Sequence, residues 1–314
     1  MAIEFSVLAE GLRFPEGPVA LADGSVLVVE MHRRTLTRVS PDGGIEVVAQ
    51  LSGGPNGAAL GPDGRCYVCN NGGFDFAQIG DALVPGLAPR DYAGGWIEAV
   101  DLATGVSTVL YRECRGVPLR GPNDLVFDGS GGMWFTDFGK AAHRRRDQGA
   151  VYYARADGSF IRQAVFPLEG PNGIGLSPDG RTLYVSESWS GRIWAYDVVA
   201  PGQLAPFSGS MPWERGRMLF SFSRYSMPDS MAIEANGNIC VGDIPHGGIS
   251  VITPEGKLLE SHPMPDAFTT NICFGGPDLR TAFVTLSSTG RLVRTRWPRP
   301  GLASNLQASF ARSS

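Results

Sequence analysis

The sequence predicts an all-β fold, a six-bladed β-propeller around a central channel, and three observations favour it. The chain of 314 residues contains 42 glycines and 23 prolines. They separate short apolar segments rich in β-branched and aromatic residues, as is typical of strands, whereas candidate helices are scarce. One unit of sequence recurs six times, at a spacing of roughly forty to fifty residues that is typical of propeller blades.

Each unit consists of a polar residue after Pro or Thr, an apolar strand, a turn and a second strand. In several units the pattern continues into a third and a fourth strand, as in SGRIWAYDV. We therefore predict a single domain over residues 1–314, built from six four-stranded blades. The six aligned segments are FPEGPVALADGSVLVVE, GPNGAALGPDGRCYVCN, GPNDLVFDGSGGMWFTD, GPNGIGLSPDGRTLYVSE, MPDSMAIEANGNICVGD and TTNICFGGPDLRTAFVT.

Two further segments complete the predicted disc. The second unit is lengthened by the stretch between Asn71 and Trp96, so we predict that residues 72–95 form a loop insertion that caps one face. The N-terminal segment IEFSVLAEG is predicted to supply the outer strand of the last blade, beside RLVRTRW. Without such closure the last blade would leave an exposed strand edge.

Charge and cysteine content limit the functional classes. The formal net charge is -4 with 18% charged residues, which argues against a nucleic-acid or acidic-membrane partner and favours a small neutral or anionic ligand. The sequence contains no apolar run long enough to span a membrane, and its start does not resemble a signal peptide, so we expect a cytoplasmic location. The oligomeric state stays open.

Five cysteines, an odd number, predict reduced thiols instead of a disulfide framework. Cys66 and Cys69 form a CxxC motif, but it lies in a predicted strand, where positions i and i+3 face opposite sides. A redox or zinc role for this motif is therefore the minor alternative.

One polar position begins the inner strand of every unit, and in a propeller these positions converge on the axis. An Asn after Pro is also a common turn former, which is the competing interpretation for any one of them. Two of the six are carboxylates, however, and these would repel each other in a channel unless they share a proton or a cation. The ring comprises Glu16, Asn56, Asn123, Asn172, Asp229 and Asn271.

The oxygen atoms that the ring side chains offer predict which kind of metal ion would bind. Glu16 and Asp229 would supply two charges, and the amide oxygens of Asn123 and Asn172 are neutral hard donors. This set suits Ca²⁺, with Mg²⁺, Mn²⁺ and Zn²⁺ as alternatives.

Four segments resemble the senescence-marker-protein/gluconolactonase/luciferin-regenerating-enzyme family, and the resemblance covers nearly the whole chain. They are FPEGP around Glu16, GPNDLVFDGSGGMWFTDFG around Asn123, GPNGIGLSPDGRTLYVSES around Asn172 and MPDSMAIEANGNICVGD around Asp229. The resemblance implies a six-bladed propeller with a divalent metal in its channel. It also implies that Glu16, Asn172 and Asp229 hold the metal, that Asp229 takes part in the chemistry, and that Asn123 contacts metal or substrate.

Details of the resemblance bear on the substrate. The FTDFG after Asn123 is most similar to the bacterial drug-responsive lactonases, and the same four-residue ligand pattern occurs in the diisopropyl-fluorophosphatases. Sugar lactonases of the animal type have an Arg two residues before this Asn, whereas this chain has Gly121 there and Arg120 one position earlier. Aromatic side chains near the expected mouth favour a less polar lactone or ester, although packing between blades would also explain them: Phe74, Phe76, Phe138 and Trp189.

Together these features predict a metal-dependent lactonase or related esterase. The cation would polarise the carbonyl, and Asp229 would act as general base or, in the second-ranked alternative, as nucleophile. Asn56 and Asn123 are candidates for binding substrate oxygens, and His246 is a candidate pocket residue or a structural histidine.

Three alternatives remain open from the sequence. An organophosphate hydrolase could use the same metal site. A strictosidine-synthase-like propeller would share the fold without this metal set, and a propeller that only binds a ligand is the third possibility, because a fold alone does not establish a function.

Overall fold

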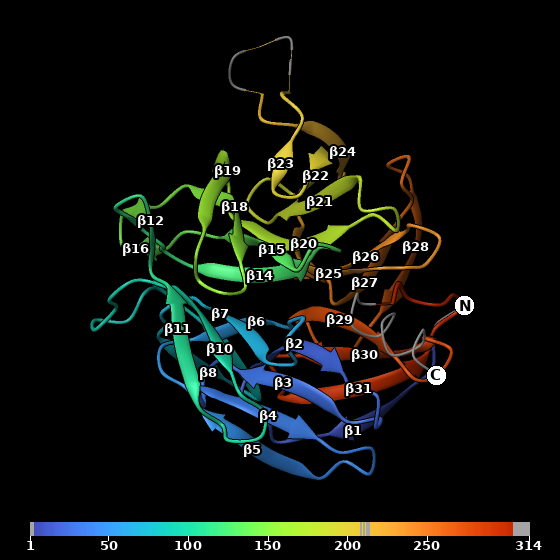
Figure 1. The fold of residues 1–314 in the computed structure, drawn as a ribbon. Helices are drawn as coiled ribbons and strands as arrows, with labels where there is room; N and C mark the ends of the chain where they lie inside the picture. The colour runs from blue at the N-terminus through green and yellow to red at the C-terminus, as the bar shows by residue number, and fades with distance from the viewer. Residues whose placement is uncertain (1–2, 208, 210, 212–213, 304–314) are drawn as a thin grey trace.

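The protein is a propeller of six blades in the computed structural model, which describes residues 3–303 except 208, 210, 212 and 213. Within these residues all regular structure is β-strand, and six sheets of four or five strands surround a common centre (Figure 1). The predicted fold class is confirmed. No helix in the described residues is long and apolar enough to cross a membrane.

Blades 1 to 3 are antiparallel sheets that follow the chain from the inside of the disc outwards. Blade 1 comprises β2 (Pro15–Ala20), β3 (Val26–Glu30), β4 (Thr35–Val39) and β5 (Ile45–Gln50). Blade 2 comprises β6 (Pro55–Leu60), β7 (Cys66–Asn70), β10 (Trp96–Val100) and β11 (Ser107–Tyr111). Blade 3 comprises β14 (Pro122–Phe127), β15 (Gly132–Asp137), β18 (Gly149–Arg155) and β19 (Ile161–Leu168).

Blades 4 to 6 repeat this arrangement. Blade 4 comprises β20 (Pro171–Leu176), β21 (Thr182–Glu187), β22 (Arg192–Ala200), β23 (Gln203–Leu204) and β24 (Arg217–Ser221), with both β23 and β24 paired to β22. Blade 5 comprises β25 (Met227–Ile233), β26 (Ile239–Ile244), β27 (Gly248–Ile252) and β28 (Leu258–Pro263). Blade 6 comprises β29 (Thr269–Gly275), β30 (Thr281–Leu286), β31 (Arg291–Arg296) and the N-terminal β1 (Phe5–Ala9).

The N-terminal strand closes the ring as predicted. β1 pairs antiparallel with β31, with Phe5 opposite Thr295 and Val7 opposite Val293. The Thr295 hydroxyl also donates a hydrogen bond to the carbonyl of Glu4 at 2.5 Å. Blade 6 is thus assembled from both ends of the chain, and β1 covers the edge that β31 would otherwise expose.

Three small hairpins lie outside the blades. They are β8 (Phe76–Ile79) with β9 (Ala82–Pro85), β12 (Glu113–Cys114) with β13 (Val117–Pro118), and β16 (Ala141–Ala142) with β17 (Arg145–Arg146). The first of them falls within the predicted insertion 72–95, and the structure therefore adds a hairpin to a segment predicted as a loop. Ile79 pairs with Ala82, so Gly80 and Asp81 form its two-residue turn, with Gly80 at φ 58°.

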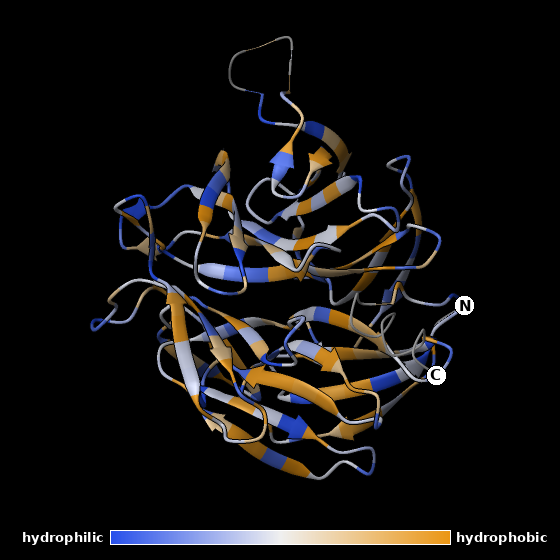
Figure 2. Ribbon diagram, viewed as in Figure 1, coloured by the Kyte–Doolittle hydropathy of each residue, from blue (hydrophilic) through white to orange (hydrophobic). Residues whose placement is uncertain are grey.

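The hydrophobic core consists of layers between neighbouring blades. Every residue of β3 is buried, and Figure 2 shows β3 as an almost continuous hydrophobic ribbon. Val26 and Val28 of blade 1 pack with Phe283 and Leu292 of blade 6, as Trp134 of blade 3 packs with the strands of blade 4. Packing sheet against sheet around the circle leaves the inner strands to line the channel.

Each inner strand is irregular where the ring residue lies. The pairing register with the second strand shifts at the start of all six inner strands, for example between Glu16 and Val19 and between Pro171 and Ile174. Such irregularities bend a strand and re-aim its side chains. The inner strands also contact one another in a closed circle, β2 to β6, β14, β20, β25, β29 and back to β2.

Glycine follows the ring residue in blades 1, 2 and 4 because neighbouring blades approach closely there. A Cβ added at Gly57 would lie 2.4 Å from the carbonyl oxygen of Asn123, and one at Gly173 would lie 2.6 Å from that of Asp229. No side chain fits at such distances. The last letter of each GPNG segment is thus explained by the approach of the next inner strand.

Candidate functional site

The six predicted ring residues lie at the starts of the inner strands, and the structure brings them together at the channel. Each is at most 9% exposed. Asn271 of blade 6 donates a hydrogen bond through Nδ2 to Glu16 Oε2 of blade 1 at 3.4 Å, which directly links the last and first members of the ring. Asn56 lies buried in β6, between Glu16 and Asn123 in the circle of strands.

The two ring carboxylates sit in an environment that opposes their ionisation. Burial, together with a smaller contribution from the negative charge of Asp124, raises the pKa of Glu16 from 4.5 to about 7. Burial also raises the pKa of Asp229 well above its usual range, and the charge of Glu16 adds to this effect. Among the described residues neither carboxylate forms an ion pair with a Lys, Arg or His side chain. Such a pair must bind a proton or a cation.

Asp124 is a third buried carboxylate that sequence reasoning missed. Burial raises its pKa to about 7, and Leu125 N–H donates to its Oδ1 at 2.9 Å. Strict alternation along a strand would place Asn123 and Asp124 on opposite faces, but the register of β14 shifts between Pro122 and Leu125. The available signal was the GPND of this unit, where two other units read GPNG.

The ring amides offer oxygen atoms to a ligand. Asn123 Oδ1 is buried and has no hydrogen-bond partner among the described residues, although an unsatisfied buried acceptor costs about 1–3 kcal/mol. Asn172 donates through Nδ2 to Ser188 Oγ at 3.2 Å, and Ser230 Oγ lies 3.4 Å from Asn172 Oδ1. An acceptor without a donor is the feature expected of a group that binds a cation or a substrate.

The donor set fits a hard divalent cation. It consists of two carboxylates and two amide oxygens, all in the class of ligands that Ca²⁺ prefers. No group of three or more His, Cys, Asp and Glu side chains placed to hold a metal ion occurs in the part of the chain that the structure describes. The predicted set contains only two such residues, Glu16 and Asp229, and relies on amides for the rest.

Phe138 and Trp189 form an aromatic pair beside the start of β20. Their ring centres lie 5.4 Å apart, and a Cβ added at Gly170 would lie 2.3 Å from Trp189 and 3.1 Å from Phe138. Trp189 is 40% exposed, and the Arg146 guanidinium lies 5.0 Å from the centre of its ring. The pair therefore packs between blades 3 and 4 and also presents an aromatic surface to solvent on the side where the inner strands begin.

His246 lies apart from the buried ring. It is exposed in the turn between β26 and β27, and its Nε2 is 2.8 Å from the carbonyl oxygen of Tyr225. Because a carbonyl can only accept, Nε2 carries the proton in this contact.

The insertion 72–95 packs over the starts of two inner strands. Its residues Phe74, Phe76 and Leu83 contact a cluster with Phe14, which precedes β2, and Phe268, which precedes β29. The Leu83 N–H donates to the carbonyl of Ser288 in blade 6 at 2.8 Å. The insertion leaves blade 2 and reaches across blade 1 to blade 6, on the face from which the ring residues enter the channel.

A buried lysine anchors the insertion to blade 3. Lys140 is 4% exposed, its Nζ donates to Asn71 Oδ1 at 3.2 Å, and it lies 3.5 Å from the ring centre of Phe74. Burial lowers the pKa of this ammonium well below its usual range, and the charge of Asp137 opposes that shift.

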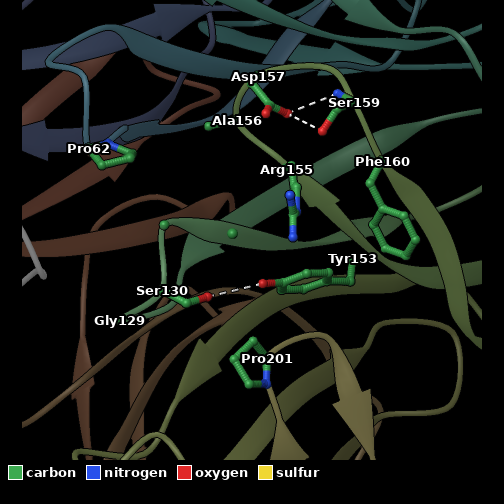
Figure 3. A pocket seen from close by; sticks show the side chains of 12 residues that line it. Pro62, Gly129, Ser130, Tyr153, Arg155, Ala156, Asp157, Ser159, Phe160 and Pro201 are labelled. Carbon is green, nitrogen blue, oxygen red and sulfur yellow. Dashed lines mark hydrogen bonds between the residues drawn. The ribbon is translucent and has the colours of Figure 1, made fainter.

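The opposite face of the disc carries two cavities. One, of about 990 Å³, is lined by the far halves of all six inner strands; Asn271 is the one ring residue in its lining, and Gly17 and Asp124, which each follow a ring residue, also line it. The other, of about 1110 Å³, lies near the turns of blades 2 to 4 (Figure 3). The Tyr153 side chain points across this second cavity toward Ser130, and their hydroxyl oxygens lie 3.3 Å apart. Neither cavity contains one of the four proposed metal ligands.

The cysteines take no part in the candidate site. All five are free, as predicted. Burial raises the pKa of the Cys66 thiol to about 12 and that of Cys69 well above its usual value, so neither is a thiolate at neutral pH.

Comparisons with known proteins agree with this architecture. The chain is 27% identical to the gluconolactonase of Zymomonas mobilis, an alignment that covers 92% of this chain and 81% of the relative. It is 29% identical to the lactonase drp35 of Staphylococcus saprophyticus, with coverage of 82% and 71%.

Solved structures show the same fold. A gluconolactonase from Xanthomonas campestris matches with a TM-score of 0.73 at 24% identity, covering 94% of this chain and 90% of the other. The calcium-binding protein regucalcin from Agrobacterium tumefaciens matches with a TM-score of 0.72 at 19% identity, covering 96% and 98%.

The model of one protein family, described as SMP-30/Gluconolactonase/LRE-like region, matches residues 14–288. This segment begins two residues before Glu16 and ends beyond Asn271, so it contains the whole ring. The chain therefore belongs to the SMP-30/Gluconolactonase/LRE-like family.

Proposed function

We propose that the protein is a metal-dependent hydrolase that opens a lactone, or a related ester, by attack of water in the propeller channel. The observation that carries the proposal is the pair of buried carboxylates, Glu16 and Asp229, which interact electrostatically and have no cationic partner among the described residues. The relatives named gluconolactonase and lactonase support a lactonase-type reaction, and the calcium-binding neighbour supports a divalent metal.

Glu16, Asn123, Asn172 and Asp229 would hold the cation, for which Ca²⁺ is our first candidate. When bound, such an ion supplies Lewis-acid polarisation of the substrate carbonyl. The unsatisfied Oδ1 of Asn123 is available either to the cation or to a donor group of the substrate. Asn56 lies next to Asn123 in the circle of inner strands and would bind a substrate oxygen through its amide N–H.

Asp229 would take a proton from the attacking water, since burial and the charge of Glu16 raise its pKa and so favour its binding of a proton. The water oxygen would add to the carbonyl carbon to give a tetrahedral intermediate, and the ring C–O bond would then break. The leaving alkoxide would take back the proton from Asp229, and the product is a hydroxy acid. A direct attack by Asp229, with an acyl intermediate, is the second-ranked course. Trp189 and Phe138 would contact an apolar substituent of the substrate at the mouth.

The test is an assay of the purified chain on γ- and δ-lactones, aryl esters and a fluorophosphate, before and after chelation and after restoring Ca²⁺ or Mn²⁺. We expect lactone hydrolysis that chelation abolishes and Ca²⁺ restores. Full activity after chelation would contradict the mechanism. Turnover of the fluorophosphate alone would assign the site to organophosphate hydrolysis, and metal binding without turnover of any substrate would favour a ligand-binding propeller.

A further inference from the structure

Two serines occupy equivalent places at the ends of second strands. Ser188 follows β21 in blade 4, and Ser287 follows β30 in blade 6. Ser188 Oγ donates to the carbonyl of Pro228 at 2.8 Å, and Ser287 Oγ donates to the carbonyl of Pro15 at 2.6 Å. Each proline directly precedes a ring carboxylate, Asp229 or Glu16. Both serines therefore tie one blade to the backbone that positions the acid of the next.

Ser188 makes one contact that Ser287 lacks. Its oxygen accepts a hydrogen bond from Asn172 Nδ2 at 3.2 Å. A serine hydroxyl has a single proton, and Ser188 uses that proton on the carbonyl of Pro228. It can only accept from Asn172, so the amide nitrogen must face Ser188 and the amide oxygen must face away from it.

The direction of this amide decides what Asn172 can bind. Only its oxygen can ligate a cation, because the NH₂ group is a donor without an available lone pair. The Asn172 amide also hydrogen-bonds to the Asp229 carboxylate, but that carboxylate belongs to the proposed ligand set. Ser188 is 2% exposed and carries no charge, so it remains an acceptor for Nδ2 that a cation does not compete for.

We propose that Ser188 is a positioning residue that fixes the direction of the Asn172 amide and thereby sets the affinity of the channel for a divalent cation. The inference rests on the proposed function for the identity of the ligand, whereas the direction of the amide follows from the contact with Ser188, and the longer contact of Ser230 Oγ with Asn172 Oδ1 at 3.4 Å agrees with it. Ser188 acts through Asn172 and the Pro228 carbonyl and does not itself hold the metal.

The experiment compares Ser188→Ala with Ser287→Ala in the full-length protein. The control removes an equivalent hydroxyl-to-carbonyl contact. Within the described residues Ser287 hydrogen-bonds directly to the side chain of none of the four proposed ligands, although its partner Thr270 hydrogen-bonds to Glu16. Calorimetric titration of the chelator-treated proteins with Ca²⁺ measures the dissociation constant. We expect Ser188→Ala to weaken binding about 10- to 100-fold, as loss of a residue that orients a metal ligand does, and Ser287→Ala to weaken it less. Ser188→Thr keeps the hydroxyl and should restore most of the affinity.

A second measurement needs no metal. The side-chain amide protons of Asn172, identified by their absence in Asn172→Asp, should shift in the NMR spectrum of Ser188→Ala and stay in place in Ser287→Ala. Equal losses of Ca²⁺ affinity in the two alanine variants, or unchanged Asn172 signals in Ser188→Ala, would overturn the inference. If the unmodified protein bound no Ca²⁺, the proposed function would fall, and the Asn172 signals would still decide whether Ser188 directs the amide.

Discussion

The negative charge of Glu16, on β2 of blade 1, adds to burial in raising the pKa of Asp229, on β25 of blade 5. Blade 6 lies between these two blades, so the two side chains can interact only across the channel. With a third carboxylate, Asp124, adding to both shifts, the channel concentrates negative charge in a buried volume. Such an arrangement favours the binding of positive charge, so we expect its occupancy by a cation to govern both activity and stability.

Replacing the proposed base should abolish most turnover. Asp229→Asn keeps the size and one oxygen of the side chain but removes the group that accepts a proton, so we expect kcat to fall by about 10²–10⁴-fold. Asn56→Ala, at a neighbouring ring position, should have a smaller effect. The measurement is steady-state hydrolysis of the best lactone with saturating Ca²⁺, and the reverse ranking of the two variants would reassign the base.

Removing the Asn123 side chain should lower the affinity for Ca²⁺ without lowering the stability of the metal-free protein. Asn123→Ala deletes a buried acceptor that has no partner among the described residues, so the metal-free protein should lose little stability or gain some. Its Ca²⁺ affinity should fall. Thermal unfolding with and without Ca²⁺ checks both expectations, and a large loss of stability in the chelated variant would show that Asn123 is a structural residue.

The metal-free protein should become less stable as the pH rises. Burial raises the pKa of Glu16 from its ordinary value of 4.5 to about 7 in the folded protein, and burial and the charge of Glu16 raise the pKa of Asp229 well above its ordinary value. The folded state therefore binds more protons than the unfolded chain above pH 4.5, and this stabilisation is lost as the pH passes through 7. Chelated protein should melt at a lower temperature at pH 8 than at pH 5.5.

Two controls accompany this pH series. Ca²⁺ should remove most of the decline, because a bound cation replaces the protons, and Glu16→Gln should reduce the decline without metal. A melting temperature of the chelated protein that rises from pH 5.5 to pH 8 would contradict the assignment of raised pKa values to these acids.

The closing strand offers a matched pair of stability variants. Leu8 is buried in the core cluster with Phe283 and Leu292, whereas the neighbouring Val7 is 43% exposed. Leu8→Ala should lower the free energy of unfolding by about 2–5 kcal/mol, and Val7→Ala by no more than about 0.5 kcal/mol. Urea unfolding of the chelated variants measures both, and equal effects would show that β1 adds little to the core of blade 6.

The sequence predicted the parts of the molecule that repeat. Six copies of one unit define six inner strands, and the polar residue that begins each strand therefore lies on the axis, as Glu16 and Asp229 do. The pairing of the N-terminal segment with RLVRTRW was predictable because a propeller must cover its last edge. Both inferences depend on symmetry and closure, which a sequence records directly.

The features that the sequence did not reveal depend on local irregularities of the strands and on the course of loops. Asp124 was missed because regular alternation places it away from Asn123, and the register shift in β14 was not foreseeable. The hairpin in the insertion was foreseeable, since Gly80 and Asp81 between short apolar runs are a recognised turn signal. The positions of Trp189 and His246 depend on loops between strands, whose course is set by contacts with distant residues such as Arg146 and Tyr225.

The pairing of β1 with β31 also imposes an order on biosynthesis. β1 is translated before the other strands of the propeller and must wait without its partner until Arg296, the last residue of β31, has left the ribosome. Synthesis proceeds at about 5–20 residues per second, so β1 stays unpaired for the time needed to translate all the strands from β2 to β31. The channel acquires its final shape only after that delay. A nascent chain halted before blade 6 should therefore bind no Ca²⁺, even though Glu16, Asn123, Asn172 and Asp229 are already present.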